Sequence, residues 1–129
     1  MRRARWLAPA ALAMALAGCP GDPEARREIE VDPAQLCASL DPESGIWEST
    51  PWSDPACPWL EYPGQAALQI PHDLGRVPRV VLPYIAFDED GMDGTLASGN
   101  TTVVWEVTDT TVTVANNTEE TFFLRLVLQ

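Results

Sequence analysis

Apolar and polar residues alternate along much of the second half of the chain. Apolar side chains recur at every second position in three segments, 103–107, 110–115 and 122–128. Because successive side chains of a strand point to opposite faces, this period of two predicts half-buried β-strands. Shorter apolar runs at 67–70 and 77–87 predict further strands, separated by turn residues such as asparagine and aspartate. Several short strands joined by short turns predict an all-β fold, a small antiparallel sandwich or an open barrel.

The segment before these strands has a different pattern, with many prolines. Asp32 is expected to be the N-cap, and Pro33 the first residue, of one short helix that ends at Asp41. From residue 45 to residue 64, proline recurs too often for a long helix. The indoles of this stretch either pack over an open face of the sheet or form a ligand platform for sugar rings. We favour packing, because a chain this short has a small core. The residues concerned are Trp47, Trp52 and Trp59.

The first residues of the chain have the layout of a secretory signal. Three arginines, at positions 2, 3 and 5, precede a run of apolar and small residues from Trp6 to Ala17. A membrane-spanning helix needs ~20 apolar residues, so this run is too short to remain in the membrane as a helix. The chain is therefore predicted to be exported.

The residues Leu16-Ala17-Gly18-Cys19 resemble the lipobox of bacterial lipoproteins, in which a leucine and two small residues precede the acylated cysteine. The resemblance implies that residues 1–18 are removed as a signal peptide and that the Cys19 thiol takes a diacylglyceryl group, with fatty acids such as palmitate. Position 20 is proline instead of the aspartate associated with inner-membrane retention, so the resemblance also implies the outer membrane. We expect a polar tether at 19–31 and one folded domain at 32–129.

The charge balance excludes several classes of partner. The 129 residues carry 19 acidic and 8 basic side chains, for a formal charge of −11, and every basic residue is arginine. Loss of residues 1–18 removes three arginines and no acid, which moves the charge to −14. Such a chain repels phosphate backbones and anionic lipid head groups, so nucleic acid is not expected as a partner. Attachment to the membrane must come from the lipid, at ~0.8 kcal/mol for each buried methylene.

Acylation of Cys19 would leave Cys37 and Cys57 as the remaining thiols. An exported chain meets an oxidising compartment, where such a pair tends to form a disulfide. A metal site at these thiols is less favoured, because His72 is the single histidine of the sequence. We therefore predict a Cys37–Cys57 disulfide that clamps the tryptophan-rich segment.

The segment from Ile70 to Pro78, with its His-x-Leu-Gly-x-x-Pro pattern, resembles a turn in small β-sandwich domains at the C-termini of phage tail-fibre proteins. The resemblance implies a structural turn leading into a core strand and does not transfer receptor binding. From the residues of the turn alone, His72 is expected to hydrogen-bond across it. A small hydrolase that uses His72 is a weaker alternative, because no nucleophile motif accompanies the histidine. No catalytic residue is predicted.

Residues 88–94 gather four carboxylates and two glycines in a loop between predicted strands. Oxygen ligands on a flexible turn suit Ca²⁺, and the candidate ligands are Asp88, Asp90 and Asp93. Their spacing departs from that of an EF-hand loop, and a solvated acidic loop is the favoured interpretation. No other cofactor is expected.

These patterns together predict a lipid-anchored bacterial envelope protein. Its expected role is that of a non-catalytic binding or structural accessory module, with an envelope protein or a glycan as partner. The alternative is a surface domain for carbohydrate binding or calcium-dependent adhesion.

Overall fold

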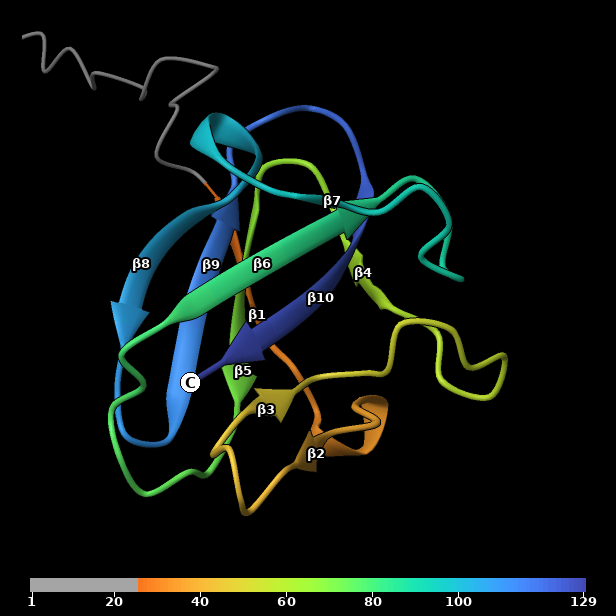
Figure 1. Ribbon diagram of the computed structural model, residues 1–129. Coiled ribbons are helices and arrows are strands. Elements are labelled where there is room, and N and C mark those ends of the chain that lie inside the picture. Colours follow the sequence, from red (N-terminus) through yellow and green to blue (C-terminus); the bar gives the residue numbers. More distant parts are fainter. Residues whose placement is uncertain (1–25) are drawn as a thin grey trace, which may run out of the picture.

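The computed structural model describes residues 26–129, which form two β-sheets packed as a sandwich (Figure 1). One sheet has four strands in the order β1-β5-β9-β8. The other has six, in the order β2-β3-β10-β6-β7 with β4 also paired to β10. The sheets are not closed into a barrel, so the predicted all-β sandwich is confirmed. The predicted signal peptide and Cys19 lie outside the described residues.

The four-stranded sheet contains two of the three alternating segments, those that form β8 and β9. Its strands are β1 (Arg27–Glu30), β5 (Ala66–Pro71), β9 (Thr111–Asn116) and β8 (Val103–Val107). β1 runs parallel to β5, and the other neighbours are antiparallel. Alternate residues of β5 and β9 are buried against the second sheet, namely Leu68, Ile70, Val112 and Val114. Their neighbours in sequence point to the opposite, outer face of the sheet.

The six-stranded sheet is organised around β10, which pairs with β6, β4 and β3. Its strands are β2 (Ser39–Leu40), β3 (Trp47–Glu48), β4 (Leu60–Tyr62), β6 (Val81–Ala86), β7 (Thr95–Leu96) and β10 (Phe122–Leu128). The predicted apolar face of β10 is buried in the core, with Leu124, Leu126 and Leu128 each 0% exposed. Pro83 fits within β6 because its carbonyl faces β7, where it accepts from the Ala97 amide, so its missing N–H falls on that side and not toward β10.

The predicted short helix is reduced to one 3-10 turn, Pro33–Gln35. The cap is as expected, because the Asp32 side chain accepts a hydrogen bond from the Ala34 amide at 2.9 Å. From Leu36 onward the backbone is extended, and Ser39 and Leu40 pair with β3. A helix this short has little stability of its own, so strand pairing and the nearby disulfide decide the conformation. A second 3-10 turn, Gly99–Thr101, precedes β8.

The predicted boundary between tether and domain is wrong for its last residues. The tether was expected to reach residue 31, but Arg27–Glu30 form strand β1 along β5 and Val31 is buried in the core. The one apolar side chain within the strand, Ile29, packs against the core, while Glu28 and Glu30 face outward. A single apolar residue between charged ones is a weak strand signal, which explains the miss.

The predicted disulfide is confirmed. Cys37 and Cys57 are bonded, with their Cα atoms 5.8 Å apart. The bond joins the segment after the first 3-10 turn to the chain just before Trp59, and the closed loop includes β2, β3 and Trp52. It therefore fixes one border of the tryptophan-rich segment.

Tyr62 is expected to make the fold sensitive to alkaline pH. Its side chain is 0% exposed, and burial raises the pKa of the phenol to about 12. Thr102 lies near this hydroxyl and lowers its pKa to a lesser extent, but the phenol oxygen has no hydrogen-bond partner within residues 26–129. In the unfolded chain, the phenol loses its proton near pH 10. The free energy of unfolding is therefore expected to fall by about 2 to 3 kcal/mol as the pH rises from 10 toward 12.

Urea unfolding of the wild type and of Tyr62→Phe between pH 8 and pH 12 measures this dependence. The variant is expected to keep its stability over the upper part of the range, whereas a matched Tyr84→Phe variant is expected to follow the wild type. If Tyr62→Phe lost as much stability at alkaline pH as the wild type, another group would control the pH dependence.

Candidate functional site

His72 holds a turn. It is buried, its Nε2 lies 3.0 Å from the Thr108 carbonyl, and its Nδ1 accepts from the Leu74 amide at 3.0 Å. These contacts assign the proton to Nε2, since Nδ1 is an acceptor. Both ring nitrogens are thus occupied by backbone groups, as the sequence predicted for a histidine that bonds across the turn.

The three tryptophans that were considered as a ligand platform differ in exposure and do not share one open face. Trp47 and Trp59 are only 4% and 3% exposed, so neither presents a ring face to a ligand. Trp47 belongs to the core, and Trp59 packs beneath the acidic loop. The platform of three residues is therefore corrected to Trp52 alone, which is 47% exposed. Their placement follows from packing, because the small core takes in two of the large indoles.

Trp52 is held in place from beneath and from its edges. The guanidinium carbon of Arg125 lies 4.2 Å from the centre of the indole, a cation–π contact. Tyr84 meets the same indole edge-on, with ring centres 4.8 Å apart, and the Trp59 ring centre lies at 5.6 Å. Trp52 is thus a partly exposed aromatic ring in a fixed position.

Arg125 supports the stack because it is itself anchored. It projects from the outer side of β10, is 2% exposed, and donates from Nε to the Thr50 carbonyl at 2.9 Å. One terminal nitrogen forms an ion pair with Glu48 at 2.9 Å. A buried charge without such partners would be costly, so Glu48 and Thr50 fix both the cation and the ring above it.

A groove of about 500 Å³ opens beside Trp52, and we call it the Trp52 groove. It lies between two loops that project from the same end of the six-stranded sheet, the loop after β3 and the loop between β6 and β7 (Figure 1). Trp52 and Met92 give it exposed apolar surface, and Asp54 and Asp90 give it carboxylates. The full lining is Trp52, Ser53, Asp54, Pro55, Asp90, Gly91 and Met92.

The two carboxylates of the Trp52 groove are oriented by their own turns. Asp54 accepts from the Ala56 amide at 2.9 Å and Asp90 from the Met92 amide at 2.8 Å, in each case through Oδ1. The second oxygen of each carboxylate forms no hydrogen bond within residues 26–129. Each therefore remains an acceptor for a ligand that donates hydrogen bonds.

The acidic loop is attached to the fold through Trp59. The Trp59 amide donates to the Glu89 carbonyl at 2.8 Å, and the indole lies against Gly91 and Gly94, where a Cβ atom would overlap the ring. Gly91 also has φ +75°, which disfavours any residue with a side chain. The two glycines thus let the loop lie flat on a buried ring, and this contact places Asp90 in the Trp52 groove.

The structure does not assemble the predicted calcium ligands. Within residues 26–129, no three histidine, cysteine, aspartate or glutamate side chains form a group that could hold a metal ion. Asp88, Asp90 and Asp93 share the loop, but Asp90 uses one oxygen to cap its own turn. Calcium binding stays an untested prediction.

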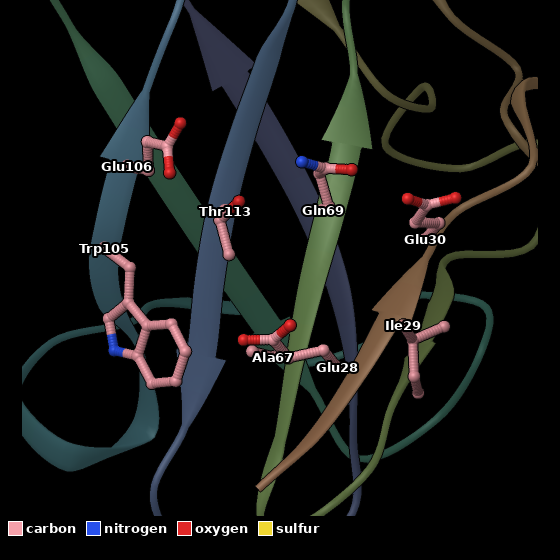
Figure 2. Close-up of a pocket in the computed structure, with 8 residues that line it drawn as sticks. All are labelled: Glu28, Ile29, Glu30, Ala67, Gln69, Trp105, Glu106 and Thr113. Atoms are coloured by element: carbon pink, nitrogen blue, oxygen red, sulfur yellow. The ribbon is translucent and has the colours of Figure 1, made fainter.

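A second groove, of about 620 Å³, lies on the outer face of the four-stranded sheet, and we call it the outer groove. Figure 2 shows Glu30, Gln69, Thr113 and Glu106 in one row across β1, β5, β9 and β8, as the strand register requires. Glu28 extends from β1 over the small side chain of Ala67, and Trp105 borders the groove on the β8 side (Figure 2). Polar groups therefore cover the whole width of this face.

Comparison with protein-family models, curated proteins and solved structures gives no match. In the described range, neither helical segment is long and apolar enough to cross a membrane.

Sequence reasoning missed several residues of both grooves. Asp54 and Met92 are short-range neighbours of predicted candidates, but nothing in the sequence joins their two loops. Arg125 looked like one polar position in an alternating strand, and only the fold places it beside Trp52. Glu28 and Glu30 were assigned to the tether, so the prediction did not include the β1 side of the outer groove.

Proposed function

We propose that this chain is a lipid-anchored binding module of the bacterial envelope, and that the Trp52 groove binds a glycan segment. The observation that carries the proposal is the indole of Trp52, 47% exposed and yet fixed by Arg125, Tyr84 and Trp59. A ring held in this way loses little conformational freedom when a ligand stacks on it. Preorganised aromatic surface with a few polar groups is typical of small-ligand sites.

The chemistry beside the ring supports a sugar as the ligand. The flat C–H face of a pyranose covers an indole, while its hydroxyl groups point outward and donate hydrogen bonds. Asp54 and Asp90 lie at the borders of the groove, and ionised carboxylates only accept such bonds. Met92 adds adaptable apolar surface. The proposed role is binding, and no bond cleavage is part of it.

The Trp52→Ala variant tests the site. Affinity electrophoresis through gels that contain soluble glucans, mannans, galactans or N-acetylglucosamine polymers identifies a retarding polysaccharide, and hexasaccharides of that sugar then give an affinity. Trp52→Ala is expected to weaken binding about tenfold through loss of the stacked ring. The matched variant Trp105→Ala, which removes an exposed indole from the other sheet, is expected to bind like the wild type. No retardation by any of the polysaccharides, or undiminished binding by Trp52→Ala, would refute the proposed site.

The anchor rests on the resemblance of Leu16-Ala17-Gly18-Cys19 to a lipobox and is tested separately. Cys19→Ser is expected to move the protein from the outer-membrane fraction to the soluble fraction and to abolish incorporation of labelled palmitate. The chain from residue 19 onward carries a formal charge of −14, which repels an anionic membrane, so the lipid is the expected means of attachment. Membrane association that survives Cys19→Ser would contradict the anchor and leave the glycan site untouched.

A further inference from the structure

The outer groove is an unpartnered sheet face with more carboxylates than guanidinium groups, because three glutamates line it and Arg26 lies at its Trp105 end. Glu28, Glu30 and Glu106 are all exposed around it, and none of them forms an ion pair within residues 26–129. The chain has no lysine, and the buried Arg125 is already paired with Glu48. Like charges gathered on one face repel one another, so a cation placed among them is favoured.

One end of this groove already holds a guanidinium. The Arg26 guanidinium carbon lies 5.1 Å from the centre of the Trp105 ring, which is 42% exposed. The buried Nε of Arg26 has no hydrogen-bond partner, so the cation–π contact is the main interaction seen at this group. The chain's own arginine thus shows which chemistry the aromatic border accepts.

An irregularity in β8 places the ring there. The register between β8 and β9 shifts between Val104 and Glu106, so Trp105 is the extra residue of a β-bulge. Bulges change the direction of side chains in a strand, and here the bulge brings an indole and the adjacent Glu106 to the border of the groove. An aromatic ring beside a carboxylate suits a planar guanidinium, which stacks on the ring and donates to the acid.

We propose that the outer groove binds an extended peptide segment of a partner protein that carries arginine at alternate positions. Glu28 and Glu30 are two residues apart on one strand, a separation of about 6.6 Å. Alternate arginines of an extended peptide have the same spacing, so each guanidinium meets one carboxylate. Between Glu30 on β1 and Glu106 on β8, the row across the sheet is uncharged. It consists of Gln69 and Thr113, whose amide and hydroxyl groups are suited to peptide N–H and C=O groups. This site is separate from the Trp52 groove and does not depend on the glycan proposal.

The test uses the peptide acetyl-Gly-Arg-Gly-Arg-Gly-Arg-Gly-amide, titrated into the full chain by calorimetry at low and at physiological salt. The Glu28→Gln/Glu30→Gln variant is expected to bind about tenfold more weakly, since each exposed pair contributes modestly. The matched variant Glu43→Gln/Glu119→Gln removes the same charge from exposed loops elsewhere and is expected to bind within about twofold of the wild type. Trp105→Ala is expected to weaken the arginine peptide more than its lysine counterpart, because guanidinium stacks better on an indole.

Three results would overturn the proposal. Equal weakening by the two charge-matched pairs would indicate general attraction to an acidic chain. Spermine binding as tightly as the peptide, with the same dependence on Glu28 and Glu30, would indicate a site for small polycations. No measurable binding of the arginine peptide at low salt would show that the groove takes no such ligand. Thermal melting of each variant confirms that the fold is kept, and unchanged glycan binding separates this test from that of the Trp52 groove.

Discussion

Gly91→Ala is expected to lower the free energy of unfolding by about 2 to 4 kcal/mol. A Cβ atom at this position would overlap the indole of Trp59, which is 3% exposed and has no room to move away. Overpacking of this kind costs about 1 to 3 kcal/mol, and the left-handed backbone at φ +75° adds about 1 kcal/mol for a residue with a side chain. The acidic loop would then separate from Trp59 and carry Asp90 away from the Trp52 groove, so the proposed glycan binding should fall as well.

Gly75→Ala is the control for the backbone cost alone. Gly75 has φ +71°, but a Cβ atom there meets nothing within 4 Å, so a loss of only about 1 kcal/mol is expected. Urea unfolding of both variants, followed by tryptophan fluorescence, measures the difference. If Gly91→Ala were no less stable than Gly75→Ala, the loop would not be packed on Trp59.

Removal of the disulfide is expected to cost about 3 kcal/mol. The bond closes a loop between positions 20 residues apart, and a cross-link of that span restricts the unfolded chain by about this amount in the loop-entropy account. Cys37→Ala/Cys57→Ala tests the value by urea unfolding without reductant. For a small domain whose total stability is on the order of 5 to 10 kcal/mol, this loss is a large share.

Dithiothreitol provides the matching control. It is expected to lower the stability of the wild type to that of the double variant and to leave the double variant unchanged. A wild type that unfolds at the same urea concentration with and without reductant would contradict a stabilising role for the Cys37–Cys57 bond.

The sequence predicted the sheets best where side-chain period alone decides the structure. The alternating segments became β8, β9 and β10, and the buried face of β10 is the predicted one. The short strands β2, β3 and β4 were not predicted, because each has two or three residues and forms through pairing with distant segments. The prediction of a helix after Asp32 was wrong for most of its length for the same reason, because long-range strand pairing overrides a weak local preference for helix.

The candidate sites show the same division between local and long-range information. Trp52 and Asp90 were both singled out, but for different ligands, and only the fold brings their loops to one groove. Trp105 was expected to alternate regularly with Glu106 across β8. The bulge breaks that alternation and places both residues at one border, a feature that no two-residue period can indicate.

The position of β10 determines the order in which the sandwich can assemble. This strand follows all the others in sequence, yet β3, β4 and β6 each pair with it. During synthesis, these strands lack their central neighbour until residue 128 has been added. Closing such long loops is slow, so the domain should remain unfolded, and open to chaperones or proteases, until its final strand is in place.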